Sequence, residues 1–100
     1  MPQSSVWSPL VREWIEKEND CFGVYQLSDE TETVLYIGKG HILTSLKSYL
    51  PEGPNHLEDA KQYRVEYAGN EKQTDKKMEI TLKKWKKKHE QLPKYNPVNI

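Results

Sequence analysis

Two short segments place tyrosines next to glycines, at a spacing that could bring two phenols together. Residues 23–25 read Gly-Val-Tyr, and residues 36–38 read Tyr-Ile-Gly after ten intervening residues. If the segments pair as neighbouring strands, the hydroxyls of Tyr25 and Tyr36 converge at one end of a sheet. A phenol with an ordinary pKa of about 10 needs a nearby cation to act as a base at neutral pH, and Lys39 directly follows the second segment. Strand tyrosines are more often packing residues, so the pair alone does not define a site.

The residues around the two tyrosines predict a β-hairpin. Residues 21–27 are rich in strand-forming side chains, residues 28–33 are all polar, and residues 34–38 read as a second strand. Gly38 and Gly40 permit a tight turn from the second strand into a helix. The hairpin would therefore carry both tyrosines and lead directly into the next element.

Two helices are predicted on either side of this hairpin in the sequence. The first covers residues 9–18, with Ser8 as its N-cap and Pro9 in its first position, where a missing N–H is harmless. The second covers residues 41–50. Its apolar residues repeat at helical spacing and would form the buried stripe: Ile42, Leu46, Tyr49 and Leu50.

A third strand and a long helix complete the predicted fold. The strand covers residues 62–68, and the helix starts near Thr74 or Asp75, either of which could cap it. The apolar stripe of this helix consists of Met78, Leu82, Trp85 and His89. The order of elements predicts an α/β (α+β) domain with a small three-stranded antiparallel sheet flanked by helices.

The two tyrosine segments resemble the signature strands of the GIY-YIG nuclease family. Only the middle residue of the first segment differs, where Val24 stands in place of isoleucine. Three further features agree with the family pattern: Lys39 after the second segment, Glu79 near the start of the long helix, and Leu-Pro-Lys-Tyr-Asn at residues 92–96. The resemblance predicts a GIY-YIG endonuclease-like fold.

The resemblance covers residues 22–96 and leaves the first helix outside it. A chain of 100 residues accommodates one small globular domain at most. We therefore expect a GIY-YIG domain over residues 22–100, preceded by an N-terminal helical extension over residues 1–21.

The resemblance implies an endonuclease that hydrolyses DNA phosphodiester bonds with one divalent metal ion. Of Tyr25 and Tyr36, one would take a proton from the attacking water and the other would help to position it, with Lys39 supplying the nearby cation. Glu79 would bind Mg²⁺ or Mn²⁺, which would polarise the scissile phosphate. Asn96 would hydrogen-bond near the substrate or hold the C-terminal tail in place.

Two of these residues have a simpler structural interpretation. Glu79 and Lys83 are four residues apart on the predicted helix and could form a surface pair worth about 0.2–0.5 kcal/mol. Asn96 precedes Pro97 and is typical of a turn. A single carboxylate with several water ligands nevertheless suits Mg²⁺.

One residue of the family pattern is missing. The family has an arginine on the helix after the second tyrosine segment, where this chain has Leu46 in an ungapped count and Ser45 if Leu46 is buried. Lys47, His41 or Arg64 could substitute for it, and His41, at the helix entrance, is a better candidate than Lys47. Losing a donor aimed at developing charge typically costs about 10²–10³-fold in rate. The chain is therefore either an active endonuclease or a catalytically weakened or inactive GIY-YIG module that binds nucleic acid or a protein partner.

The net charge of zero conceals a division along the chain. Residues 1–60 carry four Lys and Arg against ten Asp and Glu, a balance of −6, and residues 61–100 carry eleven against five, a balance of +6. The lysines of the long helix could contact a phosphate backbone or form an ordinary solvated face. We expect nucleic acid, DNA in particular, as the partner, with a homodimer or a protein partner adding specificity. The substrate-binding surface would comprise Gly38, His41, Ser45, Lys83, Lys86 and Lys87.

Composition argues against several other classes of protein. No apolar run approaches the roughly 18 residues that span a membrane, and the N-terminus lacks the apolar core of a signal peptide. Cys21 is the only cysteine, so an internal disulfide is impossible and a structural zinc site is disfavoured. These features predict a cytoplasmic protein.

Overall fold

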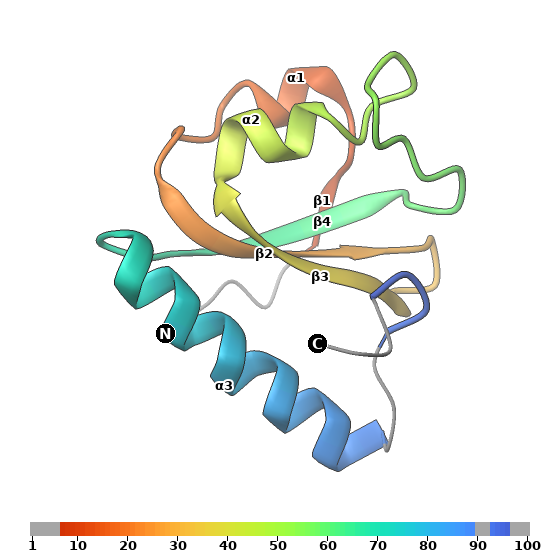
Figure 1. Cartoon of the computed structure of the whole chain (residues 1–100). Coiled ribbons are helices and arrows are strands. Elements are labelled where there is room, and N and C mark those ends of the chain that lie inside the picture. The colour runs from red at the N-terminus through yellow and green to blue at the C-terminus, as the bar shows by residue number, and fades with distance from the viewer. Residues whose placement is uncertain (1–6, 90–92, 97–100) are drawn as a thin grey trace.

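The computed structural model describes residues 7–89 and 93–96. Its centre is a four-stranded antiparallel sheet with the strand order β1-β4-β2-β3. The strands are β1 (Ser8–Pro9), β2 (Phe22–Ser28), β3 (Val34–His41) and β4 (Gln62–Tyr67). Helices α1 (Arg12–Ile15) and α2 (Ile42–Lys47) cover one face of the sheet, and α3 (Glu71–His89) covers the other (Figure 1). The predicted fold class is confirmed, although the sheet has a fourth strand.

The β2–β3 hairpin is closed by a polar loop that the sequence predicted as a turn. Its register places Tyr25 opposite Gly38. At the loop, Oδ1 of Asp29 accepts hydrogen bonds from the backbone N–H groups of Thr31 and Thr33 at 2.9 and 3.0 Å. An aspartate that bonds to the backbone two residues ahead is a standard means of closing such a turn.

Alternation along β2 divides its side chains between two apolar cores. Tyr25 and Leu27 point to the face covered by α1 and α2, whereas Val24 points to the face covered by α3. On β3, Ile37 also points toward α3. The sheet therefore separates residues that are adjacent in the sequence, and this separation decides which site residues can meet.

Helix α2 packs with the register that its sequence predicted. The predicted stripe is buried throughout and consists of Ile42, Leu46, Tyr49 and Leu50. Leu46 is 0 % exposed, while the neighbouring Ser45 is only partly buried. Regular helix ends at Lys47, so the last two residues of the stripe lie in the following turn. The residue that faces outward at the arginine position is accordingly Ser45.

Helix α3 begins earlier than predicted because Asn70 caps it. The Oδ1 atom of Asn70 accepts a hydrogen bond from the N–H of Gln73 at 2.9 Å. Thr74, which was predicted as a cap, is buried inside the helix and donates its hydroxyl to the carbonyl of Asn70. The predicted apolar stripe of α3 packs on the sheet through Met78, Leu82 and Trp85.

Within the described residues, neither α3 nor any shorter helix is long and apolar enough to cross a membrane.

The predicted N-terminal helix over residues 9–18 is wrong in most of its length. Ser8 caps no helix, because Ser8 and Pro9 form β1 and pair with β4. Regular helix is confined to Arg12–Ile15. Pairing with a distant strand outweighs the local capping signal, and an edge strand tolerates proline. Ile15 is fully buried in the core beneath α2, so this segment packs as part of the same body.

Residues 93–96 lie along the outer edge of β3. The N–H of Tyr95 donates to the carbonyl of Leu35 at 2.8 Å. The side chain of Asn96 accepts from the N–H of Ile37 and donates to its carbonyl, both at 2.9 Å. This amide takes the place of a neighbouring strand and covers an edge that would otherwise be open to pairing.

Candidate active site

Three tyrosines meet on the face of the sheet that α1 and α2 cover. Tyr25 from β2, Tyr36 from β3 and Tyr49 from the turn after α2 have ring centroids 5.8–6.1 Å apart. The hydroxyls of Tyr25 and Tyr49 are hydrogen-bonded at 2.9 Å. Tyr25 and Tyr49 are buried, whereas Tyr36 is partly exposed. The hairpin thus brings together the two tyrosines that the sequence singled out, and we call the three residues the tyrosine cluster.

Gly38 provides the space in which the two hairpin tyrosines converge. A Cβ atom at this position would lie 2.5 Å from Cζ and from the hydroxyl oxygen of Tyr25, and 2.6 Å from Cε2 of Tyr36. Carbon atoms in contact are normally separated by about 3.5–4.0 Å. Any larger residue at Gly38 would therefore push the phenols apart.

Burial makes Tyr25 and Tyr49 harder to ionise than an ordinary tyrosine. Desolvation raises the pKa of Tyr25 to about 12, although the hydrogen bond with Tyr49 opposes the shift. Desolvation also raises the pKa of Tyr49, and its hydrogen bond with Tyr25 adds to the increase. Both groups are neutral hydrogen-bonding partners at neutral pH. Tyr36 is the member of the cluster that remains partly open to solvent.

Ser45 lies beside the tyrosine cluster, at the position where the family pattern has an arginine. Its Oγ is 3.1 Å from the point that a Cβ of Gly40 would occupy. Hydrogen bonding by Ser45 also opposes the rise in the Tyr25 pKa, after the larger effects of burial and of Tyr49. A short neutral hydroxyl therefore stands where the family pattern has a long cation.

The structure removes Arg64 as a substitute for that cation. Its guanidinium donates to Oε1 of Gln26 at 2.8 and 3.0 Å, on the face of the sheet that α3 covers. His41 stays on the exposed side at the start of α2, where its ring packs on Phe22 with centroids 4.4 Å apart. Its Nδ1 lies 3.3 Å from the carbonyl oxygen of Asp20. Of these two candidates, only His41 remains near the start of α2.

Lys39 and Glu79 are engaged with other charged residues. Lys39 points to the face covered by α3 and forms an ion pair with Asp75. Glu79 lies one helical turn after Asp75 and accepts a hydrogen bond from Lys83 at 3.1 Å, the surface pair that its spacing allowed. The Glu79 side chain is 68 % exposed. Lys39 and Glu79 therefore share one side of the sheet, and the tyrosine cluster lies on the other.

The predicted metal site has Glu79 as its one protein ligand, and no further protein ligands surround the ion. The described residues contain no group of three or more His, Cys, Asp or Glu that could hold a metal ion. A single exposed carboxylate fits Mg²⁺, which retains most of its water ligands, and does not fit structural Zn²⁺. The donor set is thus compatible with a weakly held, hydrated Mg²⁺.

The remaining predicted residues fall into two groups. Asn96 is buried and binds the backbone of Ile37, so the structure gives it the task of holding the C-terminal segment. Lys83, Lys86 and Lys87 are exposed on α3.

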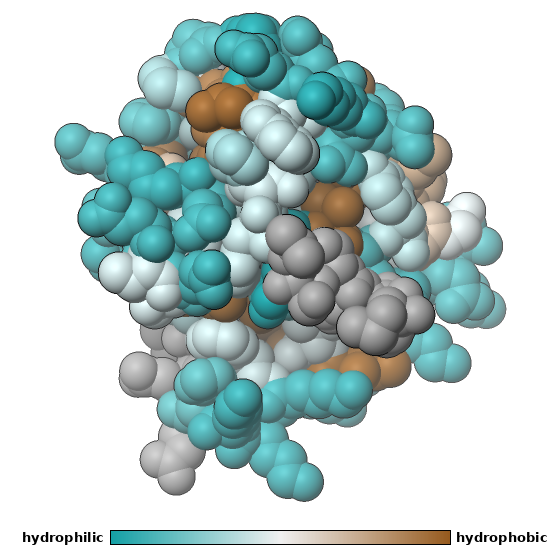
Figure 2. All heavy atoms as spheres, turned by 180° about the vertical axis from the view of Figure 1, so that it is seen from behind, coloured by the Kyte–Doolittle hydropathy of each residue, from teal (hydrophilic) through white to brown (hydrophobic). Residues whose placement is uncertain are grey.

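Seen from behind, the surface is largely hydrophilic, and its hydrophobic residues form separate small areas (Figure 2).

Tyr49 is the site residue that the sequence reasoning assigned only to the core. It was counted as an apolar residue of the α2 stripe, which its burial confirms. A buried tyrosine hydroxyl needs a hydrogen-bond partner, and this requirement could have indicated that Tyr49 belongs to the site. Its partner is the hydroxyl of Tyr25, on the strand beneath α2.

The arrangement of sheet, helices and tyrosines defines the GIY-YIG fold. The chain resembles the crystal structure of the GIY-YIG N-terminal endonuclease domain of UvrC from Thermotoga maritima bound to its catalytic divalent cation, magnesium. That match has a TM-score of 0.62 and 25 % identity, and it covers 87 % of this chain and 100 % of that chain. An asparagine-to-alanine point mutant of the same domain, also bound to its catalytic divalent cation, matches with a TM-score of 0.61 and 24 % identity over 87 % and 99 % of the two chains.

A family model described as "Domain of unknown function (DUF7508)" matches residues 1–88, and the chain belongs to that family. No curated protein matches the chain. The family match includes the segment that forms β1 and α1, which the predicted GIY-YIG domain over residues 22–100 left out.

Proposed function

We propose that the protein is an endonuclease that hydrolyses nucleic-acid phosphodiester bonds, DNA in the first instance, with a divalent metal ion. The observation that carries this proposal is the convergence of Tyr25 and Tyr36 over Gly38. Because position 38 is a glycine, the two phenol rings can approach each other over this strand. The resemblance to a magnesium-bound endonuclease domain supports the same conclusion.

The burial of the three tyrosines suggests separate roles. Burial raises the pKa of Tyr25 to about 12, further from the value that a general base needs at neutral pH, so its suited role is to orient a neighbouring hydroxyl or water. Tyr36 has access to solvent at the open side of the cluster. We assign proton removal from the attacking water to Tyr36, and its orientation to Tyr25.

Lys39 would neutralise phosphate charge after leaving its partner. The Lys39–Asp75 pair is about half-exposed on both sides, and such pairs contribute only about 0–1 kcal/mol. A phosphodiester is therefore able to compete with Asp75 for the ammonium group. Tyr36 and Lys39 lie on opposite faces of the edge strand β3. Residues 93–96 cover its edge at Leu35 and Ile37, so a nucleic-acid backbone would have to cross the strand beyond them, near Lys39, to contact both faces.

Glu79 is the residue that would hold Mg²⁺ or Mn²⁺, and a bound cation there would neutralise charge on the scissile phosphate. The exposed carboxylate can take this role only by releasing Lys83. Lys83, Lys86 and Lys87 would contact the phosphate backbone without reading its sequence.

The test is cleavage of a mixed panel of DNA and RNA substrates in the presence of Mg²⁺ or Mn²⁺. Glu79→Ala should abolish cleavage and leave the circular-dichroism spectrum unchanged. Glu71→Ala is the matched control, since it removes an exposed carboxylate from the first turn of the same helix. Equal cleavage by wild type and Glu79→Ala would point to a contaminating nuclease and remove the support for catalysis.

A second function is favoured by one specific observation, the hydroxyl of Ser45 where the family pattern has a cation that stabilises the transition state. In this alternative the domain binds nucleic acid, or a protein partner, without cleaving it. Binding should then occur without a metal ion, and Glu79→Ala should leave the affinity unchanged. No cleavage of any substrate together with salt-sensitive binding would select this alternative.

A further inference from the structure

The first turn of helix α2 is capped by a segment that lies outside the helix. His41 is the N-cap residue, but its side chain makes no capping hydrogen bond. The N–H of Ile42 donates to the carbonyl of Cys21 at 2.9 Å. The carboxylate of Asp20 accepts two hydrogen bonds from Thr44, one from the backbone N–H to Oδ1 and one from the hydroxyl to Oδ2, both at 3.0 Å. This segment therefore supplies the acceptors that the first turn of a helix lacks.

The Asp20 carboxylate has the charge that suits this place. Its hydrogen bond from the N–H of Thr44 lowers the pKa of Asp20. The carboxylate is therefore ionised at neutral pH, and a negative charge is favourable at a helix N-terminus. The backbone carbonyl of Asp20 also lies 3.3 Å from Nδ1 of His41. Asp20 lies outside residues 22–96, which the GIY-YIG pattern covers.

The turn that follows α2 completes the tyrosine cluster. Tyr49 comes five residues after Thr44, and its N–H donates to the carbonyl of Leu46 at 3.1 Å, so it continues the helical turn. Five residues of helix span about 7.5 Å, and a shift of the first turn is therefore transmitted to Tyr49. The hydroxyl of Tyr49 meets that of Tyr25 at 2.9 Å. The position of α2 thus decides whether this hydrogen bond forms.

We propose that Asp20 is a positioning residue for the tyrosine cluster, because by capping α2 through Thr44 it holds the hydroxyl of Tyr49 on that of Tyr25. Its effect on rate rests on the proposed nuclease function, whereas its effect on the two phenols does not. Loss of the carboxylate leaves the buried side chains of α2 in the core and frees the first turn. The domain then folds, but its phenols are less well aligned. A misplacement of about 1 Å can cost about 10²-fold in rate.

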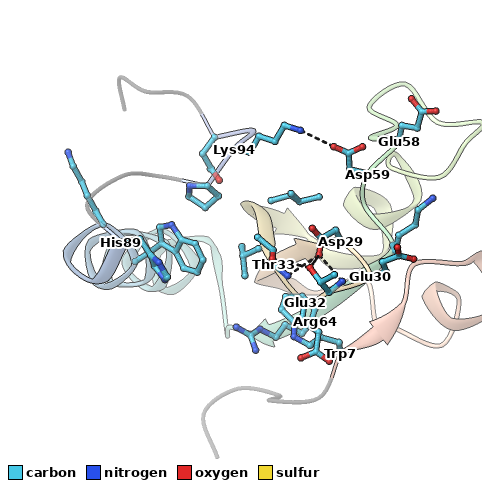
Figure 3. Close-up of a pocket in the computed structure, with 18 residues that line it drawn as sticks. Trp7, Asp29, Glu30, Glu32, Thr33, Glu58, Asp59, Arg64, His89 and Lys94 are labelled. Atoms are coloured by element: carbon cyan, nitrogen blue, oxygen red, sulfur yellow. Dashed lines mark hydrogen bonds and ion pairs between the residues drawn. The ribbon is translucent and has the colours of Figure 1, made fainter.

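The matched control is an aspartate at the other end of β2. Asp29 directly follows β2 and faces the groove between the β2–β3 loop and α3 (Figure 3). It accepts hydrogen bonds from the N–H and the hydroxyl of Thr31 at 2.9 and 2.6 Å, and a further one from the N–H of Thr33. Asp29→Ala therefore removes at least as many hydrogen bonds as Asp20→Ala, in the loop rather than at α2.

The test has a spectroscopic and a kinetic readout. In NMR spectra of protein with isotope-labelled tyrosines, Asp20→Ala should move the ring signals of Tyr49 and Tyr25, and Asp29→Ala should leave them in place. In the cleavage assay, Asp20→Ala should lower kcat by about 10–10²-fold with KM little changed, and Asp29→Ala should keep the wild-type rate. Asp20→Asn retains an oxygen that can accept from the N–H of Thr44, so it should restore both readouts. Circular dichroism establishes that each variant is folded.

A double variant tests the route of the effect. In a Tyr49→Phe background, Asp20→Ala should cause no further loss of rate, because both changes act on the same hydrogen bond. Losses of rate that simply add would mean that Asp20 and Tyr49 act separately, and they would overturn the proposal.

Two further results would overturn it. Unchanged ring signals of Tyr49 in Asp20→Ala would show that the carboxylate does not hold this phenol. Equal losses of rate in Asp20→Ala and Asp29→Ala would reflect a general loss of structure. If the wild type cleaves no substrate, the proposed nuclease activity fails, and the ring signals alone then decide the role of Asp20.

Discussion

The two faces of the sheet hold their polar groups in different ways. On the face covered by α1 and α2, Tyr25 and Tyr49 are buried, hydrogen-bonded to each other and packed around Gly38. On the face covered by α3, Lys39 and Glu79 are exposed and pair with other residues of comparable exposure. Packing fixes the phenols before any substrate arrives, whereas the charged residues are held by weak surface pairs and are free to exchange partners.

The largest effect on stability is expected when a charged side chain is introduced on the face of the sheet covered by α1 and α2, which we call the packed face. Leu46→Arg places a guanidinium at a fully buried position, and it should lower the free energy of unfolding by several kcal/mol. Ser45→Arg changes the neighbouring, partly exposed position and should fold normally. Thermal melts of the two variants measure the difference. A stable Leu46→Arg beside an unfolded Ser45→Arg would contradict the α2 register.

A smaller but still large effect is expected at Gly38. Gly38→Ala brings a methyl group into the Tyr25 and Tyr36 rings and should lower the free energy of unfolding by about 1–3 kcal/mol. Gly69→Ala is the matched control, because a Cβ there meets no heavy atom within 4 Å. Urea denaturation of both variants makes the comparison. If the two alanines behave alike, the tyrosine cluster is not closely packed.

The packed face should also make the protein sensitive to alkali. The pKa of Tyr25 is about 12 in the folded state and about 10 in the unfolded state, so between these values only the unfolded state loses the proton. The free energy of unfolding should therefore fall as pH rises from about 10 to about 12, with Tyr25 contributing about 2 kcal/mol. Tyr67, whose pKa is also raised to about 12, adds to the same slope. Tyr25→Phe should make the slope shallower, and an unchanged slope would show that Tyr25 does not titrate in this way.

The smallest effect on stability is expected on the face of the sheet covered by α3, where Lys39 and Glu79 lie. Glu79→Gln removes one partner of an exposed pair and should change the free energy of unfolding by less than about 0.5 kcal/mol. Chemical denaturation of this variant beside Gly38→Ala gives the contrast between the two faces. A large loss of stability in Glu79→Gln would mean that the carboxylate has a structural role.

Local patterns in the sequence predicted the hairpin and the α2 stripe correctly. Both depend on residues within about ten positions of one another, where periodicity and turn chemistry dominate. The N-terminal helix was wrong because Ser8 and Pro9 pair with a strand more than fifty residues away. No local signal reports such a pairing. The predicted start of α3 was too late, because Thr74 and Asp75 are both suitable N-cap residues and the helix is in fact capped by Asn70.

The candidate site was predictable only in part. The meeting of Tyr25 with Tyr36 follows from hairpin pairing, but the contact with Tyr49 depends on how α2 folds over the sheet. The pairing of Lys39 with Asp75 also arises only in three dimensions. Motif spacing therefore identified the phenols, and packing decided which of them are buried and which is open to solvent.

The most direct test of the proposed activity compares two tyrosines that each lose only a hydroxyl. Tyr36→Phe removes the open phenol of the cluster, and Tyr67→Phe removes one at the far end of β4 that bonds to Glu18 instead. In a Mg²⁺-dependent cleavage assay, Tyr36→Phe should slow the reaction by about 10²–10⁴-fold with an unchanged melting temperature, since it removes the proton acceptor. Tyr67→Phe should cleave at close to the wild-type rate. Equal rates for wild type and Tyr36→Phe would contradict a catalytic tyrosine cluster.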